Sequence, residues 1–267
     1  MANEYEIKKL MVEIGKRIWQ RGYVASNDGN FTVMLNDNEL LTTPTGVSKG
    51  FMTEDMIIKC DRTGKMISGN SKFRPSSEVK MHLEVYNQRQ DVKAIVHSHP
   101  PYATSFAVAG IPLNKCVLPE AVIVIGAVPI APYGLPSTME IPDRMKPFIK
   151  NSDAILLENH GAITFGSDLL NAYHKMETLE HTANIVWKAI QLGNVNVLPT
   201  DERDRLMTLR DKFNLPGRVA MCDATPMSNN SESPSDCGCS TKPNNSEINE
   251  QTIREITEKV LSKLKTN

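Results

Sequence analysis

The chain has 267 residues, of which 40% are hydrophobic and 23% charged, with a net charge of −1. This balance is that of a globular protein with one large domain or a domain plus an appendage, and it gives no electrostatic reason to expect nucleic acid or an anionic membrane as a partner. No apolar run approaches the roughly 18 residues of a membrane span, and the N-terminus mixes charges into its apolar positions, unlike a signal peptide, so we expect a cytoplasmic protein.

The first hundred residues predict helices and hairpins. The evidence is apolar spacing of the helical kind in some segments and alternation of the strand kind in others. In chain order we expect a helix over 5–22, a β-hairpin over 29–46, a strand pair over 56–68 turning at Thr63-Gly64, a helix over 76–89 capped by Ser76 or Ser77, and a strand over 92–99.

The second half continues the pattern to about residue 193. We expect a helix after two prolines at 100–110, one or two buried strands in 121–133, a strand pair over 153–166 bent at 159–161, and a long amphipathic helix over 168–193. Irregular alternation with hairpins favours an α/β sandwich with a mixed or antiparallel sheet over a doubly wound parallel one.

The composition changes after about residue 222, so we predict a catalytic domain over 1–221, a linker over 222–246 and a helix over 247–267. The linker is rich in Ser, Asn and Pro and cannot bury enough apolar surface to offset its chain entropy, which predicts disorder. The final segment places apolar residues along one helical face: Ile253, Ile256, Val260, Leu261 and Leu264. A single short helix is marginal in water, so its apolar stripe needs a partner.

The five cysteines are odd in number and unevenly placed: Cys60, Cys116, Cys222, Cys237 and Cys239. We therefore expect no disulfide framework, in agreement with a reducing cytoplasm. Cys237 and Cys239 alone cannot complete a four-ligand zinc site, and we assign them no role.

Two histidines close the strand "VKAIVHSH". His97 and His99 can face one point because residues i and i+2 of a strand point to the same side. A catalytic zinc needs a third protein ligand and an open position. His160, at a polar break between apolar runs, is the best third ligand, whereas His174 and His181 read as a solvated or packing face of the long helix. The alternative is two ordinary polar residues at a strand end.

Three further stretches combine small residues, hydroxyls and glycine: "GNFTV" (29–33), "TPTG" (43–46) and "PSSE" (75–78). Such stretches can hold an anion with backbone N–H and side-chain O–H groups. Taken singly, each also reads as a turn or a helix N-cap.

In order, "GN…TPTG…PSSE…HSH…NHG" resembles the class II aldolase family, in its L-fuculose-phosphate aldolase branch, over residues 5 to 215. The resemblance implies that His97, His99 and His160 bind one Zn²⁺ per subunit. It makes Glu78 the catalytic acid/base and a further candidate zinc ligand. The phosphate-binding residues implied are Asn30, Thr45, Gly46, Ser76 and Ser77. The implied fold is a nine-stranded, mostly antiparallel sheet flanked by helices, assembled as a homotetramer with active sites at subunit interfaces.

The implied activity is reversible cleavage of a deoxyketose 1-phosphate, L-fuculose 1-phosphate or L-rhamnulose 1-phosphate, to dihydroxyacetone phosphate and lactaldehyde. Zinc would stabilise the enediolate by binding the carbonyl and hydroxyl oxygens, while Glu78 moves the proton. Burial would raise the pKa of Glu78 and the start of a helix would lower it, and the sequence does not decide between them.

Two positions depart from the family pattern. A gapless count puts Leu118 where the family prototype has a tyrosine that handles the aldehyde proton, and Phe213 replaces a second tyrosine. Tyr102, Tyr133, Glu120 or a water are the candidate substitutes, so the sugar stays open.

Four alternatives follow from the same residues. A pentulose-phosphate 4-epimerase typically carries aspartate where Glu78 stands. A methylthioribulose-phosphate dehydratase uses a similar zinc and glutamate. A zinc hydrase or hydrolase leaves "TPTG" and "PSSE" without a role. A non-catalytic scaffold of the adducin kind loses the metal histidines, all of which this chain keeps.

The tail resembles the encapsulation peptides that load enzymes into bacterial microcompartments. It implies a location inside such a compartment and contact of 247–267 with shell or cargo proteins, where lactaldehyde would be confined. The alternatives are an extra oligomerisation helix and a helix docked on its own domain.

Overall fold

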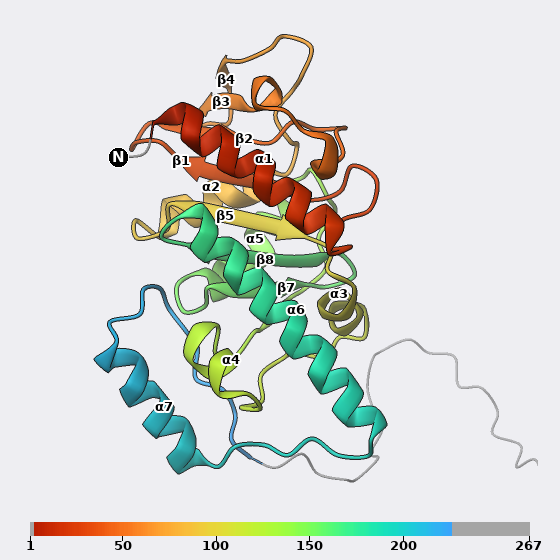
Figure 1. The fold of residues 1–267 in the computed structure, drawn as a ribbon, viewed down its shortest axis with the longest axis vertical. Helices are drawn as coiled ribbons and strands as arrows, with labels where there is room; N and C mark the ends of the chain where they lie inside the picture. Colours follow the sequence, from red (N-terminus) through yellow and green to blue (C-terminus); the bar gives the residue numbers. More distant parts are fainter. Residues whose placement is uncertain (1–2, 226–267) are drawn as a thin grey trace, which may run out of the picture. The chain divides into compact units, whose positions relative to one another are not determined.

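The computed structural model describes residues 3–225 (Figure 1). The chain divides into two units, Met1–Ser228 and Asn229–Asn267, and the description covers the first. The helix predicted over 247–267, and the linker after residue 225, lie outside the described residues.

The core of the domain is an eight-stranded sheet in the order β4-β3-β2-β1-β5-β8-β7-β6. The strands are β1 (Asn30–Met34), β2 (Glu39–Thr42), β3 (Ile58–Asp61), β4 (Met66–Ser68), β5 (Ala94–Ser98), β6 (Ile130–Ala131), β7 (Ala154–Leu157) and β8 (Gly161–Gly166). All neighbours are antiparallel except β6 and β7, which pair in parallel. The mostly antiparallel α/β fold is confirmed, with eight strands in the described chain where the family resemblance implied nine.

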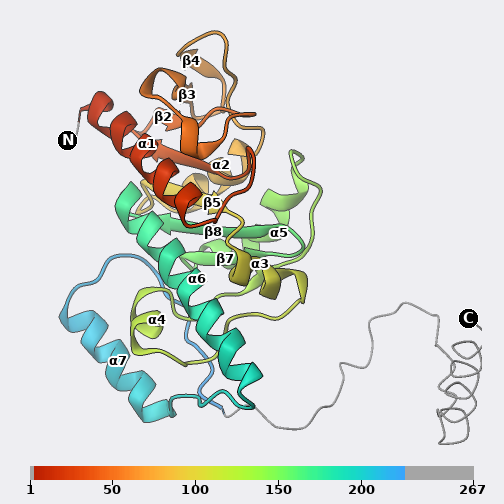
Figure 2. The same cartoon turned by 45° about the vertical axis from the view of Figure 1, so that its right-hand side comes forward.

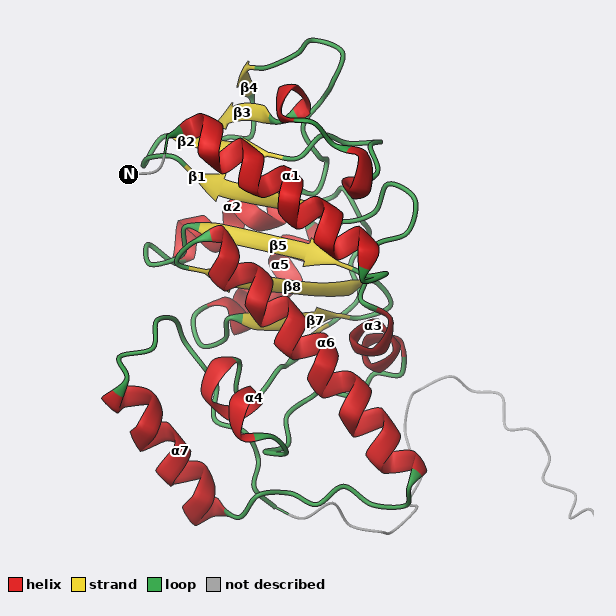
Figure 3. Ribbon diagram, viewed as in Figure 1, coloured by secondary structure: helices red, strands yellow, loops and turns green. Residues whose placement is uncertain are grey.

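Helices cover both faces of this sheet. The helices are α1 (Glu4–Gln20), α2 (Val79–Gln88), α3 (Pro101–Val108), α4 (Pro119–Val124), α5 (Glu140–Ile149), α6 (Leu169–Gln191) and α7 (Thr200–Lys212), with short 3₁₀ turns at Lys49–Phe51 and Glu54–Met56. Helices α1 and α6 cross one face, and α2 and α5 lie behind the strands on the other (Figures 1, 2 and 3).

Strand β5 shows how the sheet directs its side chains. Ala94 and Val96 pack in the apolar cluster that includes residues of α1 and α6, whereas Ile95 packs in the cluster that includes residues of α2 and α5. Because successive strand residues point to opposite faces, His97 lies on the side of Ile95. Its ring is thereby directed toward the face where α2 lies.

Most predicted elements are confirmed, and one stretch is partly wrong. The segment 121–133 was expected to hold one or two buried strands, but its first part belongs to α4, which begins at Pro119. Proline suits the first helical position because it lacks an N–H that would be unsatisfied there, and Gly126 follows the helix with a φ of 62°. The second part forms β6, as expected.

The described chain also contains two helices that sequence patterns did not predict. Helix α5 carries a proline within it, and α7 has Arg210 as its one buried residue. The Arg210 guanidinium donates hydrogen bonds to the carbonyls of Ile123, Leu215, Pro216 and Gly217. Because a buried arginine, and not a stripe of buried apolar residues, holds α7 against α4, the sequence of α7 shows no apolar periodicity that would predict a helix.

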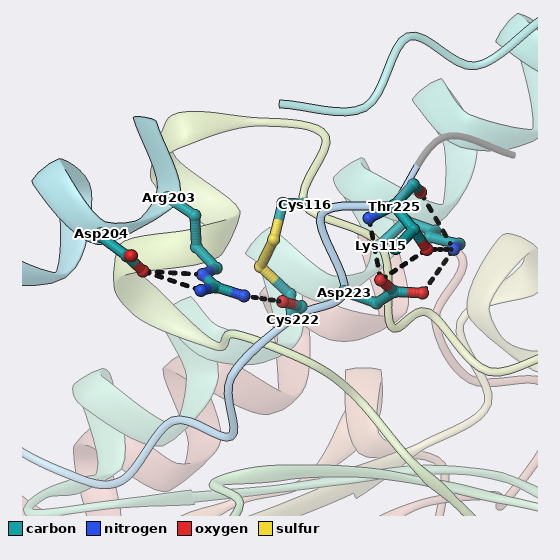
Figure 4. Close-up of a disulfide and its surroundings, with 7 residues drawn as sticks. All are labelled: Lys115, Cys116, Arg203, Asp204, Cys222, Asp223 and Thr225. Carbon is teal, nitrogen blue, oxygen red and sulfur yellow. Dashed lines mark hydrogen bonds and ion pairs between the residues drawn. A yellow bond between two sulfur atoms is a disulfide. The ribbon is translucent and has the colours of Figure 1, made fainter. Parts of the chain in front are cut away.

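The expectation of no disulfide is wrong for the described chain, because Cys116 is bonded to Cys222. Figure 4 shows this bond between the segment before α4 and the C-terminal segment. Beside it, the Cys116 N–H donates to the Asp223 carbonyl at 3.1 Å, and Lys115 pairs with the Asp223 carboxylate. Contacts with the domain thus continue past residue 221, the predicted boundary. The remaining cysteine of this region, Cys60, is buried and free.

Within residues 3–225, no helix is both long and apolar enough to cross a bilayer.

Candidate active site

Three histidines from two neighbouring strands meet at one end of the sheet. His97 is in β5, His99 follows that strand, and His160 lies in the turn between β7 and β8. One ring nitrogen of each lies within 4.8 Å of the others. The ring centroids are separated by 4.8 to 5.0 Å. The structure therefore brings together the three residues that the sequence singled out as metal ligands.

The β7–β8 turn places His160 beside the other two rings. Asn159 has a φ of 53°, a left-handed conformation that asparagine tolerates better than most residues. Gly161 pairs with Leu157 across the turn. A Cβ at Gly161 would lie 2.6 Å from Cδ2 of His99 and 2.7 Å from the Ser98 carbonyl oxygen, so only glycine allows this close approach.

The outer nitrogens of His97 and His99 have acceptors. Nδ1 of His97 is 2.9 Å from the Ala162 carbonyl oxygen, and Nδ1 of His99 is 3.3 Å from Asp28 Oδ2. An acceptor at Nδ1 fixes the tautomer that leaves the Nε2 lone pair free, a common arrangement around metal-binding histidines. Burial lowers the pKa of His97 well below its ordinary value and also lowers the pKa of His99, which keeps both rings neutral.

The two inner nitrogens test whether a cation fits. Nε2 of His97 and Nε2 of His99 are 3.2 Å apart. With both outer nitrogens protonated, these atoms are facing lone pairs that repel unless a cation lies between them. Nitrogen ligands 2.0–2.1 Å from a tetrahedral zinc are about 3.3 Å apart. The donor set and its spacing thus fit a divalent metal such as zinc.

Glu78 precedes the first residue of α2 and completes the cluster. Its Oε1 is 3.2 Å from Nε2 of His160, its Oε2 is 3.6 Å from Nε2 of His97, and Asn30 Nδ2 donates to Oε2 at 2.7 Å. Burial by itself would raise the pKa of Glu78, but the attraction of His97 and the hydrogen bonds from His160 and Asn30 hold that pKa well below its usual range. Since burial keeps His97 neutral, we assign this direction chiefly to the hydrogen bonds. Glu78 is therefore a carboxylate that can bind a metal or accept a proton.

A cavity of about 210 Å³ opens beside these groups. It is lined by Asn27, Asp28, Gly29, Asn30, Pro44, Thr45, Ser76, Ser77, Glu78, His99, Ser137 and His160. Four of the five residues that the sequence suggested for phosphate binding therefore line the same cavity as Glu78 and two of the histidines. The fifth, Gly46, lines a neighbouring hollow with Asn27, Ser26 and Ser48.

The sequence analysis missed three lining residues, which are Asn27, Asp28 and Ser137. Asp28 orients His99, and its position in "NDGN", next to a suggested anion loop, was a usable signal. Ser137 belongs to the loop between β6 and α5, and its hydroxyl oxygen is 2.7 Å from that of Ser77. The sequence signal for Ser137 was weak, because "LPST" resembles many turns.

The residues considered for the aldehyde proton lie elsewhere. Leu118, Tyr102 and Glu120 line a separate hollow beside α6. Tyr133 and Phe213 are exposed. Within residues 3–225 of one chain, no tyrosine lines the histidine cavity. His174 and His181 are exposed on α6, which agrees with the solvated one of the two roles that the sequence left open for them.

A buried polar ladder joins β1 to α2 below the cavity. His82 Nδ1 is 2.8 Å from the Thr32 hydroxyl, which is 2.8 Å from the Tyr86 hydroxyl. Tyr86 also donates to the Thr32 carbonyl. Asn30 and Thr32 alternate with buried apolar residues along β1, so their side chains lie on the same face of the sheet. Glu78, just before α2, and His82 and Tyr86 within it are spaced four residues apart, so they lie on one side of the helix. The ladder therefore fixes the register that places Glu78 beside Asn30.

Comparisons with known proteins show the family to which the chain belongs. Residues 9–187 match the family described as Class II Aldolase and Adducin N-terminal domain. The chain is 35% identical over 182 residues to 3-oxo-tetronate 4-phosphate decarboxylase of Haemophilus influenzae, covering 67% of this chain and 85% of that protein. It is 34% identical over 174 residues to L-fuculose phosphate aldolase of Methanococcus maripaludis, covering 65% and 92%.

Solved structures give the same result. YgbL from Klebsiella pneumoniae superposes with a TM-score of 0.71 at 33% identity, covering 77% of this chain and all of that one. An L-fuculose 1-phosphate aldolase superposes with a TM-score of 0.72 at 29% identity, covering 80% and 99%. The chain therefore belongs to the class II aldolase and adducin family, as an enzyme of its lyase branch.

Proposed function

We propose that the chain is a zinc-dependent lyase that breaks the carbon–carbon bond next to the ketone of a phosphorylated sugar. The observation that carries this proposal is the convergence of three imidazole nitrogens and an ionised Glu78 on the rim of a cavity lined by hydroxyl and amide groups. When bound by His97, His99 and His160, the metal supplies Lewis acidity that polarises a ketone.

The chain's own residues have separate tasks. His97 and His99 are held in their metal-binding tautomer by the Ala162 carbonyl and Asp28. Thr45, Ser76 and Ser77 present neutral donors that suit a phosphate. Asn30, hydrogen-bonded to Glu78, keeps that carboxylate directed at the histidines.

Glu78 is the group that moves the proton. In aldol cleavage it accepts the proton of the substrate hydroxyl on the far side of the bond that breaks. The electron pair of that bond passes to the carbon beside the ketone, and an aldehyde leaves. Glu78 then returns the proton to this carbon, so the reaction is balanced without a co-reactant. The substrate proposed is L-fuculose 1-phosphate or L-rhamnulose 1-phosphate, with dihydroxyacetone phosphate and lactaldehyde as products.

One observation favours a second candidate, the decarboxylation of a 3-oxo-tetronate 4-phosphate. No tyrosine among the described residues lines the cavity, and Leu118 occupies the position counted for the prototype's tyrosine. A carboxylate leaves as CO₂ without any proton transfer at the leaving group. The electron pair left behind is on the same carbon, beside the same kind of phosphorylated ketone, and taking up one proton there gives dihydroxyacetone phosphate.

The experiment compares three substrates on the zinc-loaded full chain. Dihydroxyacetone phosphate is measured with a coupled reductase, and CO₂ is measured in parallel. Triose with lactaldehyde from either deoxyketose phosphate supports the aldolase. Triose with CO₂ from the keto acid supports the decarboxylase. A zinc-containing protein that releases triose from none of the three contradicts the proposed function.

We also propose that the chain forms a homotetramer and that residues 247–267 direct it into a bacterial microcompartment through shell or cargo proteins. The support is the family resemblance for the first and the amphipathic pattern of the tail for the second. Sedimentation of the purified protein tests the tetramer.

A further inference from the structure

A serine from outside the recognised motifs lies at the anion cavity. Ser137 lines the same cavity as Thr45, Ser76 and Ser77. Its hydroxyl oxygen is 2.7 Å from that of Ser77. Its φ is 67°, in the left-handed region, which is unfavourable for a residue that carries a Cβ.

The loop that carries Ser137 is held by several contacts. Lys80 Nζ donates to the Ser137 carbonyl at 2.9 Å. The Thr138 hydroxyl donates to the Leu135 carbonyl at 2.6 Å and accepts from the Glu140 N–H at 3.1 Å. The unfavourable backbone of Ser137 is thus imposed by its surroundings, and it fixes the hydroxyl at the cavity.

The hydroxyl pair has one hydrogen to spare. Ser77 and Ser137 carry two O–H hydrogens, and the bond between them uses one. The other has no acceptor among the described residues, and because both serines are exposed it is available to a ligand that enters the cavity. An anion with several strong acceptor oxygens satisfies this donor, and hydrogen bonds to a charged acceptor are stronger than neutral ones.

We propose that Ser137 is a further substrate-binding residue, which joins Ser77 in holding the substrate's phosphate. Lys80 is a positioning residue that keeps the loop against the start of α2. This inference deepens the proposed function and rests on it for the identity of the anion as a substrate phosphate.

The test measures binding of inorganic phosphate to the zinc-loaded full chain by calorimetry. Ser137→Gly and Ser137→Ala both remove the hydroxyl, but glycine relieves the left-handed strain and alanine keeps it. We expect both variants to bind phosphate roughly 10-fold more weakly, as the loss of one charge-assisted hydrogen bond predicts, with unchanged zinc content. With a cleaved sugar phosphate, KM should rise by a similar factor while kcat changes little, because ground state and transition state lose the same contact.

Two variants complete the design. Lys80→Met should weaken phosphate binding and Lys80→Arg should restore most of it. Asn214→Gly replaces another left-handed residue, with a φ of 49°, in the turn after α7, and should leave binding unchanged.

Each remaining outcome has a defined meaning. Unchanged affinity in both Ser137 variants overturns the inference, and so does a loss in the alanine variant alone, which would assign the effect to the backbone. If no sugar phosphate is cleaved but both variants still bind phosphate weakly, the anion site stands and the proposed reaction falls.

Discussion

The histidines of the cavity differ in how each is fixed. His97 and His99 have acceptors at their outer nitrogens, whereas Nδ1 of His160 is buried with no hydrogen-bond partner among the described residues. His160 is therefore oriented by the turn that carries it and by the contact of its Nε2 with Glu78 Oε1 at 3.2 Å. Glu78 has a different status again, because its hydrogen bonds favour the charged form.

These differences predict that two substitutions have different effects on zinc binding and on turnover. His97→Ala should lose both zinc and activity, because a buried nitrogen donor disappears. Glu78→Gln should keep most of the zinc, since three imidazoles remain, but lose turnover by several orders of magnitude. Metal analysis and triose release measure the two effects, and His181→Ala, on the exposed face of α6, is the control. A Glu78→Gln enzyme with a near-normal rate would contradict the role assigned to the carboxylate.

The burial of Lys49 predicts how the free energy of unfolding depends on pH. Its Nζ is buried and donates to the carbonyls of Asn27 and Val47, which flank the cavity loops. Burial lowers its pKa from 10.5 to about 8. Between these values the unfolded chain holds a proton that the folded chain has released, so stability rises with pH in this range, and below pH 8 the penalty is fully present.

The comparison with Lys49→Met isolates this effect. The wild-type free energy of unfolding, minus that of the variant, should grow by up to about 3 kcal/mol from pH 8 to pH 10.5. Urea unfolding at several pH values measures it. Parallel curves for the two proteins would show that Lys49 is not the group responsible.

Individual site residues could be predicted from the sequence where a short local motif contains them. His97 and His99 are two positions apart, so strand geometry alone directs them to one side. Asp28 contacts His99 and Ser137 contacts Ser77, and no local spacing predicts these pairings of residues far apart in the chain.

Among the elements, the end of α2, the start of β7 and helix α6 meet at one buried carboxylate. Asp153 accepts from Arg89 at 2.7 Å and from Lys175 at 2.6 Å, and all three side chains are at most 2% exposed. The Arg218 N–H also donates to it at 2.9 Å. One side chain thus joins three elements and the C-terminal segment.

Asp153→Ala should therefore destabilise the fold strongly. Removing the carboxylate leaves two buried cations without their common partner, which costs on the order of 3–5 kcal/mol. Asp143→Ala, which breaks the exposed pair with Lys146, should cost about 1 kcal/mol or less. Urea unfolding measures both, and equal losses would show that burial does not decide the cost.

Element prediction succeeded where apolar patterns matched one period. The hairpins β1–β2 and β7–β8 and the long α6 were all readable in this way. Helix α4 was misread because its short apolar run fits a strand equally well, and Pro119 was the overlooked signal. Helix α7 was not predicted, because its one buried residue is an arginine and its sequence therefore lacks the apolar spacing from which helices are predicted.

For the whole molecule, the Cys116–Cys222 bond closes a loop with a sequence separation of 106. In the chain-entropy view such a cross-link contributes about 4.7 kcal/mol. We expect a peptide containing both cysteines in a non-reducing digest, and a lower free energy of unfolding after reduction. Cys222→Ser should lose this sensitivity to reductant. A wild-type protein with equal stability under both conditions would contradict the bond's contribution.

The tail carries a prediction about location, from sequence pattern alone. A fluorescent reporter fused to residues 247–267 should form foci in cells that make a microcompartment shell. Replacing Ile256 and Leu261 with serine should abolish the foci, because the apolar stripe is interrupted. Diffuse fluorescence of the unaltered fusion would count against encapsulation.

The pairing of β5 with β8 has a consequence for how the protein reaches its native state. His97 and Ala162 are neighbours across this pair although 65 positions separate them in the chain. Closing so long a segment is slow compared with forming a local turn. Binding of the proposed metal ion during refolding should therefore come late, after β5 and β8 have paired, and a colorimetric chelator could time that step.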